Sequence, residues 1–465
     1  MSSGPAGIGI GGRALTVMIT GLALFAMYFG AGNLILPVMI GIEGGTAAGA
    51  VTGGFVLTGV LLPVLAMVAA ATSEQGIEGI AYRIGRYPGL VYCWIAFLST
   101  GMLYAIPRVA TVSFGMSVGA IGNLPGDPGS PALLIYTAVF LVVAALLAAN
   151  PTNLISKVGS WLTPALLILM LVLIVGALTQ LTPVLDAPAE KYTAAPFVSG
   201  LLTGYNTLDA IASLVFGGIV IDSLRSHGFT HGAPLFRTTV LAGLLAGALL
   251  ALIYFGLGSV GTRIGDAEVS DGAAGLAHAA WLLFGAPGQW LLGLIAILAC
   301  LTTSVGLFGA SVTFFNKHFP RVGRTRLLII HVAVAFAVAN LGLATLMNLV
   351  VPLMYFCYPV TIAIVAVAIA DIFIPGHLFW SYRFTAWASA VFGLIDAILQ
   401  GYSLFAVTPP DWFTALIKAI PFADLSLGWV VPALLGFTIG MICDGATGRF
   451  AKHLDMRQTV DQELA

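Results

Sequence analysis

The sequence predicts an all-α polytopic membrane protein. Hydrophobic residues make up 59% of its 465 residues and charged residues only 8%, whereas a soluble domain is about 25% charged. Long apolar runs recur along the whole chain, separated by short polar breaks. Because one bilayer core takes about 20 apolar residues, a chain of this length can cross it about twelve times.

Twelve apolar segments define the expected spans in chain order. They cover residues 15–40, 48–72, 89–120, 132–149, 155–180, 196–220, 235–261, 287–315, 326–346, 347–370, 384–405 and 427–443. A polar, glycine-rich stretch around residues 266–285 predicts a longer outer loop that contains a short helix.

Lysine and arginine residues sort to one side of the predicted membrane. With the N-terminus inside, fourteen of the 18 fall in the inner loops, at the inner ends of spans or in the two tails, and Arg108 alone lies well inside a span. The outer loops hold Lys191, Arg263 and Lys418. Cytoplasmic loops of membrane proteins carry such an excess of positive charge. We therefore expect a multi-pass protein of the cell membrane whose tails, residues 1–14 and 444–465, are both cytoplasmic.

The first span contains residues that suit a continuous helix poorly. Gly30, Gly32 and Asn33 lie at mid-membrane depth, and Pro37 follows them. Glycine and proline weaken a helix, and at this depth the freed backbone groups need a partner other than lipid. A helix that opens to face a ligand accounts for this composition. Close helix packing through small residues is the alternative.

The sixth span repeats the pattern in the run TGYNTLD, residues 203–209, where Gly, Asn, Thr and an ionisable Asp lie near mid-span. Two interrupted spans five positions apart predict two five-helix halves of opposite orientation, residues 15–180 and 196–370. Two additional helices, residues 384–443, follow them. Inverted-repeat transporters bind their solute at the midplane, between paired broken helices.

Broken helices suit a zwitterionic solute. Amide groups at a helix N-terminus attract a carboxylate, and exposed carbonyls at the other broken end offer oxygen ligands to Na⁺ or to an ammonium group. The predicted substrate-binding residues are Gly30, Ala31, Gly32, Asn33, Tyr205, Asn206, Thr207 and Asp209.

Three adjacent hydroxyl residues, Thr302, Thr303 and Ser304, interrupt the otherwise apolar eighth span. Such side chains often bond back to the preceding helical turn, which is the alternative interpretation for each of them. A neighbouring pair that faces the broken first helix would complete an all-oxygen site for a small hard cation. We assign Thr303 and Ser304 to this pair.

At these positions the chain resembles the branched-chain amino acid:cation symporters, the system II carriers of leucine, isoleucine and valine. Residues 29–37, FGAGNLILP, look like that family's first-helix signature, and the blocks IPR (106–108), GYNTLDA (204–210) and CLTTS (300–304) follow in matching order. The resemblance implies the five-plus-five inverted-repeat fold of sodium-coupled leucine and neurotransmitter transporters, with two added helices. It also implies Na⁺-coupled symport of branched-chain amino acids into the cell by alternating access, with no cofactor besides the coupling ion.

The same resemblance implies particular sodium ligands. In the wider fold, one sodium site uses main-chain oxygens of the broken first helix and hydroxyls of helix eight. On this chain the site becomes the carbonyls of Ala26 and Phe29 with the hydroxyls of Thr303 and Ser304. Asn33 then lies where the fold can build a second ion site beside the substrate carboxylate.

Ionisable residues also lie within the spans. Arg108 follows Pro107 in span three, and Asp209 lies on the broken sixth helix. A charge near the bilayer centre costs about 3 kcal/mol even on a lenient scale, so we expect the two to face the interior and to pair. The pair would gate the pathway or tune the carboxylate site, or else tie helices three and six together. For Asp396 in span eleven we expect a structural or oligomer-interface role.

Other functions find less support in the sequence. It contains no His-rich metal cluster, nucleophile–base arrangement or soluble catalytic domain, so we expect no enzyme activity. The formal net charge of −1 gives no reason to expect a nucleic-acid partner. The alternative is a proton-coupled or uncoupled carrier of another small neutral amino acid or a nucleobase-like solute. Lys157, at the start of span five, would favour this sodium-independent alternative if its side chain took the sodium position, as a lysine does in some relatives of the fold. An ion channel would need a continuous pore.

Overall fold

The computed structural model is helical and has no strand in the residues that it describes. It describes residues 10–449 except 74, 150–153, 185, 206, 208, 230–231, 265–270, 342, 375, 406 and 426. The helices are α1 (Ile10–Tyr28), α2 (Ala31–Gly44), α3 (Ala48–Ala71), α4 (Ile77–Ala81), α5 (Arg86–Leu98), α6 (Ala105–Met116), α7 (Val118–Gly122), α8 (Pro131–Ala148), α9 (Leu154–Lys157), α10 (Thr163–Gln180), α11 (Pro196–Tyr205), α12 (Asp209–Ser226), α13 (Gly232–Gly261), α14 (Gly272–Phe284), α15 (Ala286–His318), α16 (Arg324–Ala339), α17 (Leu343–Phe373), α18 (Trp380–Leu404), α19 (Asp411–Lys418) and α20 (Val430–Ala446). The predicted all-α membrane fold is confirmed.

Long apolar helices supply the membrane spans. By length and composition, eight helical segments of the described chain can cross a membrane, or nine if α11 and α12, whose directions differ by 45°, form one span. Each predicted range falls on one helix or on consecutive helices, and α14 is the short helix expected in the outer loop. The count of twelve, the domain limits and the inverted relation of the two halves stay predictions.

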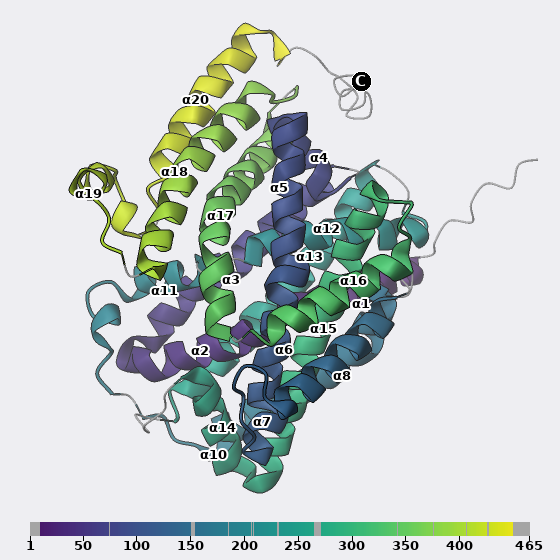
Figure 1. The fold of residues 1–465 in the computed structure, drawn as a ribbon, viewed down its shortest axis with the longest axis vertical. Coiled ribbons are helices and arrows are strands. Elements are labelled where there is room, and N and C mark those ends of the chain that lie inside the picture. The colour runs from purple at the N-terminus through teal and green to yellow at the C-terminus, as the bar shows by residue number, and fades with distance from the viewer. Residues whose placement is uncertain are drawn as a thin grey trace, which may run out of the picture.

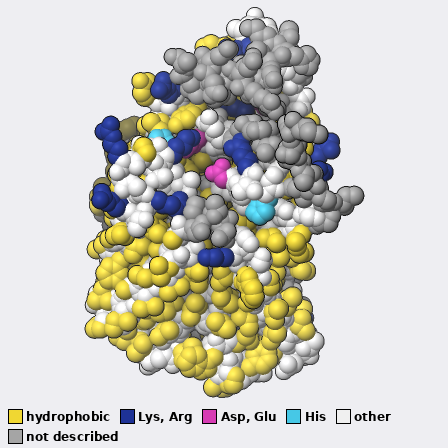
Figure 2. Space-filling view, turned by 90° about the vertical axis from the view of Figure 1, so that its right-hand side faces the viewer, with side chains coloured by type: hydrophobic (Ala, Val, Ile, Leu, Met, Phe, Trp, Pro, Cys, Tyr) yellow, Lys and Arg dark blue, Asp and Glu magenta, His cyan; other side chains and the backbone are white. Residues whose placement is uncertain are grey.

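The surface is divided between apolar and basic regions. Figure 2 shows hydrophobic side chains over the lower part of the molecule and Lys and Arg side chains gathered over the upper part. The upper end is where α5 and α18 begin and α20 ends (Figure 1). Large apolar side chains such as Trp161 and Ile442 are 80% and 71% exposed, as expected for residues that face lipid. Both termini are still expected on the cytoplasmic side, since the basic end matches the predicted inner loops.

Helix α15 forms the centre of the molecule, and most of its residues from Ala299 to Phe315 are buried. It contacts α1, α12, α6, α8 and α16. In Figure 1, α17, α18 and α20 lie side by side at one edge. The two additional helices predicted after residue 384 therefore form a layer on α17, which in turn packs against α3 and α12.

Glycine allows two pairs of helix backbones to touch. A Cβ atom on Gly41 of α2 would lie 2.1 Å from the carbonyl oxygen of Gly258 on α13, and one on Gly200 of α11 would lie 2.0 Å from the carbonyl oxygen of Val51 on α3. No larger residue fits at these contacts without moving a backbone. The four elements α2, α3, α11 and α13 are thus packed as closely as helices can be.

An aspartate on α20 caps the start of α18. The Asp444 side chain is completely buried. Its carboxylate accepts hydrogen bonds from the backbone N–H groups of Trp380 at 2.9 Å and Ser381 at 3.0 Å and from the Ser381 hydroxyl at 2.7 Å. The first amides of a helix lack partners within it and carry partial positive charge, so this contact stabilises both helices.

The third span contains an interruption that the sequence analysis missed. The expected single span over residues 89–120 is divided into α5, a π-helical turn (Ser99–Leu103), α6 and α7. Gly101 has φ −90° and ψ −123°, and Tyr104 has φ −144° and ψ −65°. A Cβ atom on Gly101 would lie 2.7 Å from Ser311 Oγ, so this turn passes close to α15.

Candidate functional site

The first span is broken at Phe29 and Gly30, as the sequence predicts. Helix α1 ends at Tyr28, and Gly30 has the extended torsions φ −100° and ψ −168° before α2 begins. In a continuous helix the Gly30 N–H would donate to the carbonyl of Ala26. Here it donates to Tyr28 O over 2.9 Å. The break therefore releases the Ala26 carbonyl for another partner.

Hydroxyl groups on α15 take up the released carbonyl. Thr302 Oγ1 lies 2.9 Å from Ala26 O, and Thr303 Oγ1 lies 3.4 Å from the same oxygen. A Cβ atom on Gly30 would lie 3.4 Å from Thr303 Oγ1, so Thr303 also borders the break. The structure thus brings Ala26 and Thr303 together beside the break that follows Tyr28, and the carbonyl of Phe29 as an ion ligand stays a prediction.

Ser304, the other predicted hydroxyl ligand, does not reach the Ala26 carbonyl. Its Oγ atom is buried and has no hydrogen-bond partner among the described residues, and Thr302 is the second hydroxyl beside Ala26. Thr302 Oγ1 also lies 3.0 Å from Leu298 O and 2.9 Å from Ala299 O. Successive side chains of a helix point about 100° apart, so a shift of one residue changes which hydroxyl faces α1.

Asn33 joins the two broken helices. Its side chain is buried in the first turn of α2, and its Nδ2 donates to Asp209 Oδ2 at the start of α12 over 3.0 Å. The same nitrogen donates to the hydroxyl of Tyr254 on α13. The sequence analysis missed Tyr254, because a tyrosine in an apolar span carries no signal that it faces the centre. The predicted residues Gly30, Gly32, Asn33 and Asp209 are thus close together.

The remaining predicted residues of the sixth span are placed differently. The Tyr205 hydroxyl accepts a hydrogen bond from Trp429 Nε1 over 3.0 Å, and its ring packs edge-on against Tyr358 with centroids 4.9 Å apart. Its side chain therefore points to α17 and α20. Thr207 Oγ1 donates to the carbonyl of Gly204 over 2.9 Å. Asn206 lies outside the described residues, and only the backbone of Ala31 is described.

Arg108 does not form the expected ion pair with Asp209. Its Nη1 donates to the hydroxyl of Tyr104 over 3.0 Å, and its guanidinium lies 5.6 Å from the centre of that ring. A Cβ atom on Gly32 would lie 3.6 Å from Arg108 Nη2. Arg108 and Asp209 are thus each hydrogen-bonded to a neutral group, Tyr104 and Asn33, and their role as a gate or charge pair stays a prediction.

Asp396 and Lys157 lie away from this centre. Asp396 is 8% exposed on α18, and Lys157 is exposed at the end of α9. Among the described residues, no hydrogen bond or ion pair connects Lys157 with Ala26, Thr302 or Thr303. Lys157 therefore does not occupy the position proposed for sodium.

A second polar network, absent from the sequence analysis, lies beside the break in span three. Ser311 Oγ of α15 lies 2.9 Å from Nε2 of the buried His331 and 3.2 Å from the carbonyl oxygen of Phe97. His331 Nδ1 lies 2.7 Å from Leu327 O on its own helix, so Nδ1 carries the hydrogen. This network connects α15, α16 and the turn before Gly101.

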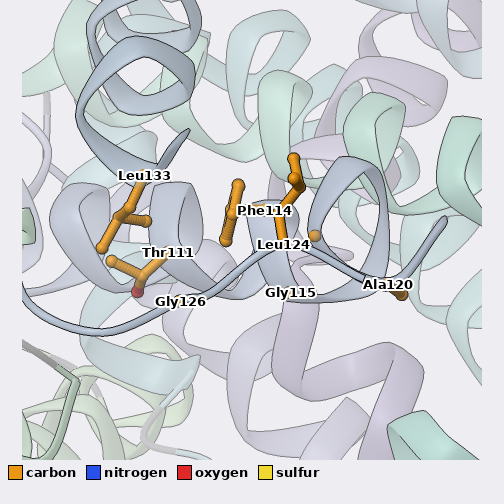
Figure 3. Close-up of a pocket in the computed structure, with 8 residues that line it drawn as sticks. Thr111, Phe114, Gly115, Ala120, Leu124, Gly126 and Leu133 are labelled. Atoms are coloured by element: carbon orange, nitrogen blue, oxygen red, sulfur yellow. The ribbon is translucent and has the colours of Figure 1, made fainter. Parts of the chain in front are cut away.

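A cavity of about 350 Å³ opens at the end of α6. Figure 3 shows Thr111, Phe114 and Leu133 on its walls. Thr111 is one helical turn from Arg108, and its Oγ1 donates to Arg108 O over 2.9 Å. The cavity lies beyond the broken helices, so it is separate from the polar centre.

Carbonyl, hydroxyl, amide and carboxylate oxygens dominate the centre between the broken helices. Within the described part of the chain, no group of three or more His, Cys, Asp and Glu residues could hold a metal ion. The oxygen-rich arrangement suits a small monovalent cation and a polar solute.

Comparisons with known proteins agree with the sequence resemblance. The model of a family described as "Branched-chain amino acid transport protein" matches residues 13–447. The chain is 38% identical over 429 residues to the branched-chain amino acid permease BrnQ of Corynebacterium glutamicum, with 92% of this chain and 95% of the relative covered. It is 34% identical over 445 residues to BrnQ of Escherichia coli (94% and 97% covered). It is 33% identical over 449 residues to the branched-chain amino acid transport system 2 carrier protein of Pseudomonas aeruginosa (94% and 98%).

Solved structures confirm the fold. The crystal structure of a manganese transporter from Eremococcus coleocola matches with a TM-score of 0.60 at 13% sequence identity, covering 95% of this chain and 97% of that chain. A likeness at this identity concerns the fold alone.

Proposed function

The chain belongs to the branched-chain amino acid transport protein family, and from this premise we propose that it is a Na⁺-coupled symporter of leucine, isoleucine and valine. It works by alternating access and carries the solute into the cell. It is a transporter and not an enzyme, as its family and relatives are permeases.

The observation that carries sodium coupling is the environment of the Ala26 carbonyl. This oxygen, released by the break, lies within 3.4 Å of the hydroxyls of both Thr302 and Thr303. With the carbonyl of Phe29, which the family resemblance assigns to the site, they would supply four oxygens, the kind of ligand set that unwound helices offer to Na⁺. The ion would bind α1 to α15.

Thr302 can release its hydrogen bond when the ion arrives. A hydroxyl that ligates a cation must direct a lone pair to the ion and its hydrogen elsewhere. Thr302 Oγ1 already lies within 3.0 Å of the carbonyls of Leu298 and Ala299. The hydrogen of the Thr302 hydroxyl therefore has an acceptor both with and without the ion.

The substrate takes the adjoining space between the two breaks. The first amides of α2, at Gly30–Asn33, offer partial positive charge to a carboxylate. Thr207 and Asp209 border the same region from the sixth span. Apolar residues of α1 and α15 face the aliphatic side chain, and they discriminate weakly among the three substrates because one methylene is worth only about 1–3 kcal/mol.

The exposed position of Lys157 supports sodium rather than a lysine as the cation at Ala26. Proton-coupled or uncoupled transport of another small solute is the competing outcome of the test.

The test is uptake of labelled leucine into proteoliposomes that contain the purified protein. An inward Na⁺ gradient is compared with an inward H⁺ gradient of equal size and with K⁺ in place of Na⁺. We expect saturable uptake with the Na⁺ gradient alone, reduced by unlabelled isoleucine and valine. Uptake driven equally by H⁺ without Na⁺ would overturn sodium coupling. Leucine uptake that unlabelled isoleucine and valine do not reduce would overturn the assignment of branched-chain amino acids as substrates.

A further inference from the structure

Two opposite charges face the broken helices without touching each other. Arg108 lies on α6, and Asp209 is the first residue of α12. Arg108 borders Gly32, and Asp209 is hydrogen-bonded to the next residue, Asn33. Within the described chain, neither of them takes part in an ion pair. Charges inside a membrane protein are normally paired because an isolated charge is costly there.

Neutral groups hold both charges in place. Arg108 donates to the Tyr104 hydroxyl over 3.0 Å, and Asp209 accepts from the Asn33 amide over 3.0 Å. These hydrogen bonds orient the guanidinium and the carboxylate but neutralise neither of them. Each charge can therefore bind a further ionic group.

The side chains of Arg108 and Asp209 both remain partly exposed near the start of α2. Arg108 and Asp209 keep part of their surface exposed, as do Gly32 and Thr207. The guanidinium lies at Gly32, where a Cβ atom would be 3.6 Å from Nη2. Asn33, the partner of Asp209, is the next residue on that turn. Arg108 thus lies beside Gly32 and Asp209 beside Asn33, two consecutive residues in the first turn of α2.

We infer that Arg108 binds the carboxylate of the transported amino acid and that Asp209 binds its α-ammonium group. The inference rests on the proposed function, since it assigns ligands for that substrate. A free α-amino acid carries both charges on one carbon, so its binding neutralises both side chains at once. An amine or a carboxylic acid with the same side chain leaves one of them unpaired. A guanidinium also matches the geometry of a carboxylate.

This arrangement divides recognition between two parts of the site. The two ionic side chains select for a zwitterion, and apolar contacts then select the side chain. Tyr104 is a positioning residue, since its hydroxyl orients Arg108 and need not touch the substrate.

The test combines two kinds of change. Ligands that lack the carboxylate or the ammonium group are measured against variants that lack the side-chain charge proposed to bind it. Competition against labelled leucine is measured with 3-methylbutylamine, which lacks the carboxylate, and with 4-methylpentanoate, which lacks the ammonium group. Full-length wild-type, Arg108→Gln and Asp209→Asn proteins are compared. Arg108→Gln should weaken leucine binding about tenfold to a hundredfold, the usual range for an ionic hydrogen bond, and leave 3-methylbutylamine binding within about twofold. Asp209→Asn should show the same split between leucine and 4-methylpentanoate.

Controls separate this inference from a structural role and from the proposed function. Arg108→Lys keeps the charge and should restore part of the leucine preference. Tyr104→Phe keeps the ring and should produce a smaller loss for leucine alone, and it decides the question if Arg108→Gln does not fold. Equal weakening of leucine and 3-methylbutylamine in Arg108→Gln and Tyr104→Phe would overturn the inference. If wild-type protein does not bind leucine at all, the proposed function itself fails, whatever the variants do.

Discussion

The side chain of Asn33 ties the two broken helices together, because its amide nitrogen donates to the carboxylate of Asp209 across 3.0 Å. Asn33→Ala should lower leucine uptake about tenfold or more, since it leaves a carboxylate without its donor and such groups cost about 1–3 kcal/mol. Tyr254→Phe, which removes the other partner of Asn33, should have a smaller effect. Uptake rates at equal reconstituted amounts decide this, and wild-type rates for Asn33→Ala would contradict it.

The hydroxyls of α15 should differ sharply in their effect on sodium. Thr302→Val and Thr303→Val each remove an oxygen beside Ala26 and should raise the Na⁺ concentration for half-maximal uptake about tenfold. Ser304→Ala is the matched control on the same helix, since the Ser304 Oγ has no partner in the described part of the chain. Its sodium dependence should stay close to wild type. A large effect of Ser304→Ala alone would instead support the assignment made from the sequence.

Variants of Gly30 should impair the site without unfolding the protein, in contrast to a variant of Gly41. Its torsions, φ −100° and ψ −168°, suit any residue, so Gly30→Ala should fold and transport at a reduced rate. Gly30→Val places further atoms toward Thr303, which a Cβ already meets at 3.4 Å, and should abolish uptake while the protein still reaches the membrane. Gly41→Ala, which would press on the backbone of Gly258, should instead lower expression and melting temperature. Similar melting curves for all three variants would argue against this distinction.

Asp444→Asn should destabilise the protein and leave transport affinity unchanged. The variant keeps one acceptor oxygen but loses the negative charge at the start of α18, which should cost about 1–2 kcal/mol. A lower melting temperature in detergent with an unaltered leucine KM is the expected result. A changed KM at wild-type stability would mean that Asp444 acts on transport.

Trp429 and Tyr205 should behave as one unit. Trp429→Phe and Tyr205→Phe each remove the 3.0 Å hydrogen bond between α20 and α11. The double variant should therefore lose little more activity than either single one, because residues in direct contact are not additive. Strict additivity of the three measured uptake rates would show that the bond does not couple the helices.

The sequence predicts the fold better than the detail of the site. Apolar runs locate the spans, and the clustered glycines and Asn33 locate the first break, because irregular backbone at mid-membrane depth is tolerated only where protein or a cavity faces it. The break at Gly101 was missed because a lone glycine in an apolar span more often marks close packing.

The side-chain partners depend on helix rotation, which hydropathy does not reveal. Thr303 and Ser304 were assigned to the ion site, whereas Thr302 and Thr303 lie beside the Ala26 carbonyl. The two pairs differ by one residue along α15, and each residue turns the side chain by about 100°. The Arg108–Asp209 pair followed from charge alone. The hydroxyl of Tyr104 and the amide of Asn33 could only be found as competing partners once the helices were packed in three dimensions.

The contacts at Gly41 and Gly200 restrict how the molecule can change shape. Where two helix backbones are already in contact, rotation or sliding of one helix would displace the other. The broken helices α2 and α11 are therefore expected to travel together with α13 and α3 as one block. We therefore expect the relative displacement that opens the substrate site first to one side of the membrane and then to the other to occur where this block meets α15 and α6, at the contacts of Gly30 with Thr303 and of Gly32 with Arg108.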